Sequence, residues 1–171
     1  MRIHKCVFLD RDGVLNQERG DYTFVEADFK IIDGVKESLE ILKKSGFLLI
    51  VITNQAGIAK GIYTRDDVMK CHRLLQSKTG DLIDDIYFSP NHPITSESLL
   101  RKPNSLMLEK AMAKWDIDPN KSFMIGDSVR DIQAAEKAGV KGIFVGNKSD
   151  EKTTAFKAQD LRDAVDKFII G

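Results

Sequence analysis

The sequence alternates short apolar runs with segments whose apolar residues recur at helical spacing, and this alternation limits the fold more than any other feature. Residues 6–9, 48–52, 83–88, 122–125 and 142–145 are short, apolar and rich in residues that favour strands. Val35, Leu39 and Leu42 begin a series of three- and four-residue spacings that predicts amphipathic helices. Apolar strands separated by helices indicate a parallel sheet covered on both faces. The sequence therefore predicts a doubly wound, mainly parallel, Rossmann-like α/β domain.

Other features of the chain suggest where the helices end and where a ligand would bind. Asp33, Thr64 and Asn104 are expected as helix N-caps. The least structured stretches are expected at 16–30, 90–102 and 147–158. In a doubly wound sheet, the ligand site lies beyond the carboxyl ends of the strands, where the strand order reverses. Because the first two stretches follow predicted strands, we expect them to border that site.

Composition argues against several classes of partner. The 171 residues are 42% hydrophobic and 30% charged, so we expect residues 1–171 to form a single soluble domain. Lys plus Arg equals Asp plus Glu at 26 each, which predicts neither nucleic acid nor an anionic membrane as a partner. The first apolar run is too short for a signal peptide or a membrane span, so a cytoplasmic location is expected. Cys6 and Cys71 are expected to be reduced core residues.

Polar side chains follow the predicted strands, at the edge where the ligand site is expected. In chain order they are Asp10 and Asp12 after the first strand, Thr53 after the second, Lys102 before the third major helix, and Asp127 and Asp131 after the fourth strand. Gly13 permits the sharp turn by which both carboxylates of the Asp-x-Asp pair can face one centre.

These residue types meet the needs of phosphoryl transfer from a monoester. The reaction requires a nucleophile, a divalent metal, donors for the phosphate oxygens and a proton for the leaving alkoxide. Asp10 and Asp127 would suit magnesium, a hard ion that takes few protein ligands. Thr53 and Lys102 suit the phosphate oxygens, and Asp12 can serve as the proton donor. The sequence therefore favours a magnesium-dependent phosphoryl-transfer site.

The set resembles the four motifs of the haloacid dehalogenase-like (HAD-like) hydrolases, in the same order along most of the chain. The resemblance implies Asp10 as the nucleophile that becomes phosphorylated, Asp12 as general acid and then base, Thr53 and Lys102 as the phosphate-holding pair, and Asp127 as a metal ligand. The main-chain carbonyl of Asp12 is implied as a further metal ligand. Asp131 would touch the metal through water or orient Lys102, or it could be a surface residue on the first turn of a helix.

The two places where HAD-like enzymes insert a cap domain hold too few residues for one. The site is therefore expected to be open, or covered by short loops or by a neighbouring copy in a homo-oligomer. Residues 10–16, 53–61 and 101–103 resemble the capless branch that contains D-glycero-D-manno-heptose 1,7-bisphosphate phosphatase and histidinol-phosphate phosphatase. The resemblance implies that Asn54, Gln55 and Arg101 bind substrate, although Asn54 could also cap a turn and Arg101 could be a solvated loop charge.

The implied substrate is a sugar bisphosphate such as D-glycero-D-manno-heptose 1,7-bisphosphate, with histidinol phosphate or another small phosphorylated metabolite as the alternative. One feature of the branch is missing. Relatives hold a structural zinc with a Cys-x-His pair and a later Cys-x-Cys pair, whereas this chain has Ser89, Asn91 and His92 and then no cysteine before Arg101. No structural zinc is therefore expected, and His92 is expected to be a loop histidine.

Three interpretations from other classes are less well supported. A receiver module uses similar residues, but its phosphorylated aspartate follows the third strand. A regulatory protein that binds phosphate and turns over weakly would not need both Asp10 and Asp12. A mutase shares the nucleophile but must shield the phosphoenzyme from water, for which no cap is visible. Hydrolysis is favoured.

Overall fold

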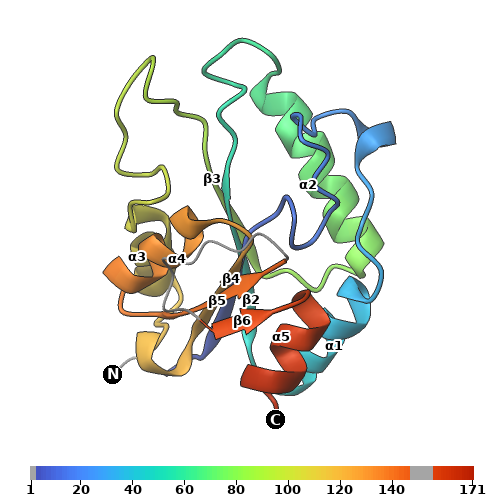
Figure 1. The fold of residues 1–171 in the computed structure, drawn as a ribbon, viewed down its shortest axis with the longest axis vertical. Coiled ribbons are helices and arrows are strands. Elements are labelled where there is room, and N and C mark those ends of the chain that lie inside the picture. Colours follow the sequence, from blue (N-terminus) through green and yellow to red (C-terminus); the bar gives the residue numbers. More distant parts are fainter. Residues whose placement is uncertain (1–2, 147–155) are drawn as a thin grey trace.

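The computed structural model describes residues 3–146 and 156–171, and its centre is a parallel six-stranded sheet. The order across the sheet is β3-β2-β1-β4-β5-β6, and the two edge strands, β3 and β6, lie at opposite ends of the sheet (Figure 1). The strands are β1 (Cys6–Leu9), β2 (Leu48–Asn54), β3 (Asp85–Ser89), β4 (Phe123–Gly126), β5 (Lys141–Val145) and β6 (Phe156–Ala158). Every neighbouring pair is parallel, so the predicted doubly wound α/β fold is confirmed.

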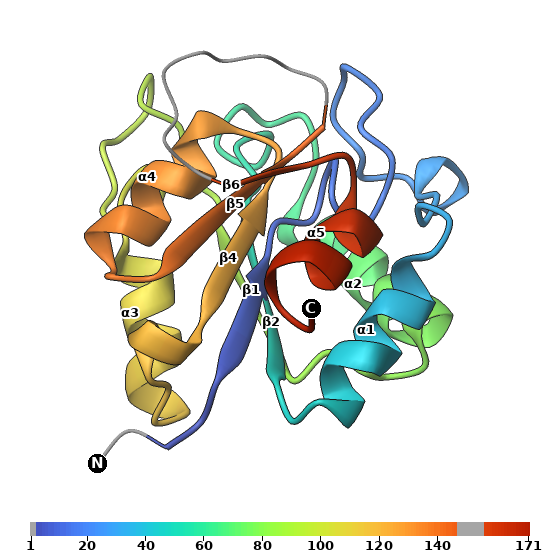
Figure 2. The ribbon, with the colours of Figure 1, turned by 60° about the horizontal axis from the view of Figure 1, so that its bottom comes forward.

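Helices cover both faces of the sheet, with α1, α2 and α5 on one face and α3 and α4 on the other (Figure 2). Their bounds are α1 (Val35–Lys44), α2 (Arg65–Thr79), α3 (Leu106–Lys114), α4 (Val129–Lys137) and α5 (Leu161–Phe168), with short 3-10 helices η1 (Glu26–Asp28) and η2 (Pro119–Lys121). Two apolar cores result. Val7 and Leu9 of β1 pack into the first core, and Cys6 and Phe8 pack into the second, because successive side chains of a strand point to opposite faces.

The strand order places a ligand site at one edge of this sheet. From β1 the chain builds outward through β2 to β3, and then returns to place β4 on the other side of β1. The order therefore reverses between β1 and β4. In doubly wound folds the crevice outside the carboxyl ends at such a point holds the ligand, and Asp10 and Asp127 directly follow these two strands.

Some predicted boundaries were wrong. β2 continues through Asn54, so Thr53 and Asn54 belong to the strand, held in register with Phe88 and Ser89 of β3. The third strand begins at Asp85 instead of residue 83. β6 lies within a stretch expected to be unstructured; its three residues, Phe-Lys-Ala, form no apolar run, and pairing with β5 defines the strand. Residues 147–155 of that stretch lie outside the described residues.

The helix caps were predicted in part. Thr64 caps α2 in a capping box with Asp67, as expected. Asp33 and Asn104 are not N-caps, because α1 begins after Gly34 and α3 after Ser105, each without a side-chain cap hydrogen bond. Cys6 and Cys71 are buried free thiols. Among the described residues, no helix is both long enough and apolar enough to cross a bilayer.

Candidate active site

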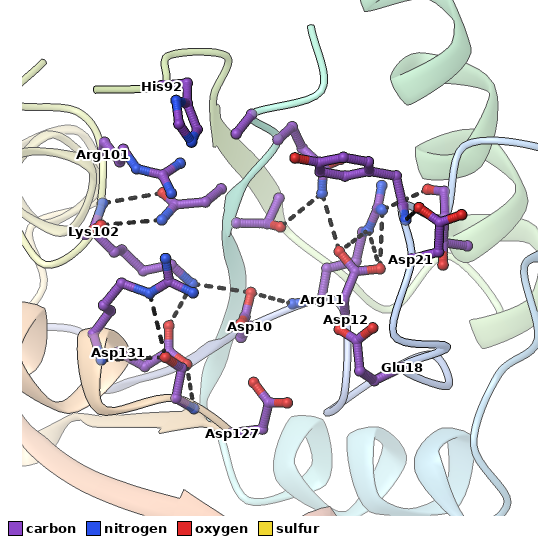
Figure 3. Close-up of a pocket in the computed structure, with 18 of the residues that line it drawn as sticks. Asp10, Arg11, Asp12, Glu18, Asp21, His92, Arg101, Lys102, Asp127 and Asp131 are labelled. Atoms are coloured by element: carbon purple, nitrogen blue, oxygen red, sulfur yellow. Dashed lines mark hydrogen bonds and ion pairs between the residues drawn. The ribbon is translucent and has the colours of Figure 1, made fainter. Parts of the chain in front are cut away.

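Asp10 lies at the junction of β1 and β4 and pairs with a buried lysine. Its main-chain N–H donates to the carbonyl oxygen of Ile125 at 2.9 Å, which ties the end of β1 to β4. Lys102 Nζ lies 2.9 Å from Asp10 Oδ1 and 2.6 Å from Asp131 Oδ1, and it donates to the carbonyl oxygen of Ile52 at 2.7 Å (Figure 3). The Lys102 side chain is 2% exposed. The ammonium is therefore fixed between two carboxylates.

Three carboxylates form a cluster beside this lysine. Oxygen atoms of Asp10, Asp127 and Asp131 all lie within 4.8 Å of one another. Burial raises the pKa of Asp10 to about 8, and the Asp131 carboxylate adds to the rise while Lys102 opposes it. A divalent cation would offset this crowding of negative charge, and hard oxygen donors suit magnesium. The residues present therefore fit a magnesium ion.

Gly13 brings Asp127 into the cluster. Its φ of +82° lies in the left-handed region that glycine adopts without strain. A Cβ atom at this position would lie 2.2 Å from Asp127 Oδ2. The predicted requirement for a sharp turn therefore has two causes, the backbone conformation and the space that Asp127 occupies.

Asp131 is buried and does not lie on the surface. Its side chain is 1% exposed, and it packs against the end of β4, where a Cβ on Gly126 would lie 2.3 Å from Asp131 Oδ2. The other role of Asp131 is local. Its Oδ2 accepts the main-chain N–H of Ser128 at 3.1 Å in the capping box of α4. The contact with Lys102 agrees with the orienting role that the resemblance implied.

The carboxylate of Asp12 has different neighbours. Arg11 donates to it through Nη2 at 3.0 Å and through Nε at 3.2 and 3.3 Å. Asn16 Nδ2 donates to Oδ1 at 2.9 Å, and Gln55 Nε2 donates to Oδ2 at 3.1 Å. The side chain of Asp12 is thus held by donors on both oxygens, apart from the carboxylate cluster of the metal site.

The residues of the Thr-Asn-Gln segment point to different partners. Thr53 is buried, and its Oγ1 accepts Gln55 Nε2 at 3.0 Å. Asn54 makes two hydrogen bonds to the main chain of Lys102, accepting its N–H at 3.0 Å and donating to its carbonyl at 3.1 Å. All three residues line the pocket, and the side chains of Asn54 and Gln55 form hydrogen bonds with Lys102 and Asp12.

The pocket above these residues has a volume of about 360 Å³. Arg101 and His92 lie on one side of the pocket and Glu18 and Asp21 on the other (Figure 3), and the pocket is also lined by Arg130 and by Lys60, whose Nζ lies 5.5 Å from the centroid of the Tyr22 ring. Both loops expected to border the site do so. Burial lowers the pKa of Arg101, and the positive charge of Arg130 lowers it further.

The sequence did not single out Arg11, Asn16, Tyr63 or Arg130. Arg11 is 1% exposed, and its position between two predicted catalytic aspartates was the available signal. Arg130 lies inside the Gly-Asp-x-x-x-Asp motif and could have been found in the same way. Asn16 and Tyr63 come close to Asp12 and Gln55 through turns that the sequence pattern does not specify.

Comparison with known proteins agrees with this geometry. The HAD-hydrolase-like family model matches residues 99–167. The solved structure of D,D-heptose 1,7-bisphosphate phosphatase from B. bronchiseptica, complexed with magnesium and phosphate, superposes with a TM-score of 0.88 over 95% of this chain and 96% of that chain, at 25% identity. Fold and site therefore define a HAD-like phosphatase.

Sequence relatives narrow the class. D-glycero-D-manno-heptose-1,7-bisphosphate 7-phosphatase of Chlorobaculum tepidum is 33% identical over 100% of this chain and 97% of its own length. The β-anomer enzyme of Photorhabdus laumondii is 39% identical over 91% of this chain and 88% of its own, and the α-anomer enzyme of Burkholderia mallei is 40% identical over 80% and 77%. The chain belongs to this family of HAD-like heptose-bisphosphate phosphatases.

Proposed function

We propose that the chain is a magnesium-dependent phosphomonoester hydrolase that works through a phosphoaspartate on Asp10 and acts on D-glycero-D-manno-heptose 1,7-bisphosphate. The observation that carries the proposal is the position of Asp10, which sits at the strand-order reversal, 2.9 Å from a buried lysine and within 4.8 Å of two further carboxylates. Magnesium, held by Asp10, Asp127 and the main-chain carbonyl of Asp12, would supply positive charge that offsets the repulsion between carboxylates and phosphate.

In the first half of the reaction, a carboxylate oxygen of Asp10 attacks phosphorus and the bond from phosphorus to the leaving oxygen breaks. Lys102 and Thr53 hold equatorial oxygens of the phosphoryl group as their charge shifts. Asp12, in its protonated form, gives its proton to the leaving alkoxide. Asp131 keeps the ammonium of Lys102 in place from the opposite side.

In the second half, water attacks the phosphorus of the phosphoaspartate. Asp12, now a carboxylate, takes the proton of that water, and the bond between phosphorus and Asp10 breaks. Inorganic phosphate leaves, Asp10 is again a carboxylate, and Asp12 has regained its proton. Protein atoms are unchanged after one turnover.

Two arginines that line the pocket support a substrate with a second phosphate. Arg101 is anchored by a hydrogen bond from Nη1 to the carbonyl of Asn91 at 3.1 Å, and Arg130 at the start of α4 lies close enough to lower its pKa. A guanidinium recognises phosphate through two parallel donors. A distal phosphate between the two would relieve their mutual repulsion, and the names of the relatives agree with a bisphosphate.

Histidinol phosphate is the second candidate, and two acidic residues of the pocket favour it. Glu18 and Asp21 line the pocket opposite Arg101 and could receive a cationic leaving group. We further propose that residues 1–171 act as one domain on a small phosphorylated metabolite in the cytoplasm, with no nucleic-acid or membrane partner, which the balanced charge supports. A neighbouring copy in a homo-oligomer could cover the open side of the pocket.

The experiment compares kcat/KM for heptose 1,7-bisphosphate, heptose 7-phosphate and histidinol phosphate. We expect the bisphosphate to be preferred and Arg101→Ala to lower its kcat/KM by about ten- to a hundredfold, as expected for a charge-assisted contact, while the monophosphate changes little. Arg19→Ala, at an exposed arginine paired with Asp28, is the control. An equal fall in kcat/KM for all three substrates would show that Arg101 does not recognise the second phosphate. A preference for histidinol phosphate would favour the second candidate.

The chemistry is tested separately through Asp10→Asn, which keeps the size of the side chain but removes the attacking anion. Turnover of every substrate should fall by at least about 1,000-fold. Acid-quench trapping of labelled phosphoenzyme should detect a phosphoaspartate in the wild type and none in Asp10→Asn. Near wild-type turnover by Asp10→Asn would refute the mechanism.

A further inference from the structure

A buried chain of hydrogen bonds leads from the expected general acid to a tyrosine in the loop after β2. Gln55 Nε2 donates to Asp12 Oδ2 at 3.1 Å, and the hydroxyl of Tyr63 donates to Gln55 Oε1 at 2.8 Å. Gln55 is 2% exposed and Tyr63 is 6% exposed. Both side chains are therefore largely buried, at the wall of the pocket that the metal cluster also lines.

The polarity of this chain is fixed at its far end. The main-chain N–H of Gly57 donates to the Tyr63 oxygen at 3.3 Å, which leaves the hydroxyl hydrogen for Gln55 Oε1. Burial raises the pKa of Tyr63 to about 12, so its proton stays in place. The amide of Gln55 must then present its NH₂ group to Asp12 and Thr53.

The tyrosine itself is held on several sides. Its ring lies so close to Gly57 that a Cβ there would meet Tyr63 Cε1 at 2.0 Å. Phe24 stacks on the ring with centroids 5.0 Å apart, and Tyr22 meets it edge-on at 5.7 Å. Residues 16–30 therefore pack against the ring whose hydroxyl orients Gln55. This packing leaves Gln55 little freedom to rotate its amide.

We propose that Gln55 and Tyr63 are positioning residues that aim the carboxyl group of Asp12 at the leaving oxygen of the substrate. The proposal rests on the general-acid role proposed above for Asp12. Gln55 donates to Oδ2 of Asp12, Asn16 donates to Oδ1, and Arg11 donates to both oxygens. Tyr63 determines which end of the Gln55 amide faces Asp12. Neither residue needs to touch the substrate.

This role predicts a dependence on the leaving group. A sugar phosphate expels a weakly acidic alcohol that needs a proton in the transition state, whereas 4-nitrophenyl phosphate expels a stable phenolate that does not. Because kcat/KM covers the steps up to release of the alcohol, it isolates the half-reaction in which Asp12 donates. A misplaced general acid therefore lowers kcat/KM for alkyl esters far more than for the aryl ester.

The experiment measures kcat/KM for heptose 1,7-bisphosphate, mannose 6-phosphate and 4-nitrophenyl phosphate at saturating magnesium. For Tyr63→Phe, we expect kcat/KM for the alkyl esters to fall roughly three- to tenfold more than kcat/KM for the aryl ester. The effect is limited because Arg11 and Asn16 still hold Asp12. Gln55→Glu replaces the donor with an acceptor, and its differential loss should exceed about tenfold. Tyr87→Phe, which removes a hydroxyl in β3 outside the pocket, should leave the ratio unchanged.

Asp12→Asn separates this inference from the function on which it rests. This substitution should lower kcat/KM for the alkyl esters by roughly 100-fold or more relative to kcat/KM for the aryl ester. If Asp12→Asn depresses all three substrates equally, the general-acid role itself is wrong. The other contradicting result is that Asp12→Asn lowers kcat/KM more for alkyl than for aryl esters while Tyr63→Phe and Gln55→Glu lower kcat/KM equally for both. In that case Gln55 and Tyr63 are merely structural, and the positioning role is refuted.

Discussion

Replacing Lys102 by Met tests whether the buried ammonium holds the site together electrostatically. The side chain is 2% exposed and lies 2.9 Å from Asp10 and 2.6 Å from Asp131. Burial alone would lower the pKa of Lys102, but the two carboxylates outweigh it and raise the pKa, so the lysine is charged. Methionine has a similar length and no charge, and the substitution leaves the buried carboxyl group of Asp131 and the part-buried carboxyl group of Asp10 without the ammonium between them.

The size of the effect follows from this burial. Removing one partner of a buried ion pair costs about 3–5 kcal/mol, because the remaining charge stays uncompensated. A domain of this size has roughly 5–15 kcal/mol of total stability and shifts its Tm by about 2–4 °C per kcal/mol. In chelator, Lys102→Met should therefore unfold roughly 6–20 °C below wild type. Magnesium should stabilise the variant more than the wild type, because it replaces the lost positive charge.

Thermal unfolding in chelator measures the shift in Tm, and urea unfolding with chelator and with excess magnesium measures the free energy of unfolding in each condition. Lys114→Met is the matched control, since Lys114 pairs with Asp85 at 2.7 Å but is 59% exposed, and an exposed pair contributes about 1 kcal/mol or less. The electrostatic argument fails if Lys102→Met in chelator lies within about 1 kcal/mol of wild type. It also fails if magnesium stabilises the two proteins equally.

Three further predictions follow from the site and the core. Gly13→Ala should bind magnesium more weakly in a calorimetric titration, because the new Cβ would collide with Asp127. It should also lose about 1–2 kcal/mol of stability, because the backbone at this position has a φ of +82°. Unchanged magnesium affinity would refute the steric argument. Chelation should abolish turnover reversibly, with magnesium restoring it, and elemental analysis should find no tightly held zinc; one zinc per chain would contradict our interpretation of Ser89 and Asn91. Burial lowers the pKa of His72 from 6.5 to about 3, so between these values the unfolded chain binds more protons. Stability is therefore fully present above about pH 6.5 and falls with pH by up to about 1.4 kcal/mol per unit; His72→Leu should flatten the urea-unfolding free energy between pH 6 and 4, and equal slopes in the two proteins would refute it.

Local patterns predicted the main strands and helices because their causes are local. Apolar spacing selects which face of a helix is buried, and the capping box at Thr64 depends on a residue only three positions away. The same limit explains the errors. β6 has no apolar run and forms by pairing with β5, and the start of α1 at Gly34 depends on a left-handed backbone instead of a capping side chain.

The candidate site was predicted as a set of residues but not as an arrangement of contacts. Its motifs are short and specific, so Asp10 and Lys102 could be named from the sequence although 92 positions separate them. The directions of side chains could not. Asn54 and Gln55 are adjacent, yet one holds the main chain of Lys102 and the other holds Asp12, because successive residues at the end of a strand point to opposite sides.

The sequence by itself determined the main strands and helices, the burial of both faces of the sheet and the chemical groups available for phosphoryl transfer, since these depend on spacing and side-chain chemistry. The tertiary structure decided which groups meet. Placing β1 between β2 and β4 brings Asp10 beside Asp127 and delivers Lys102 from the loop before α3. The packing of residues 16–30 on Tyr63 orients Gln55 toward Asp12. These contacts join residues far apart in the chain, and sheet order and loop packing, which no local pattern encodes, bring them together.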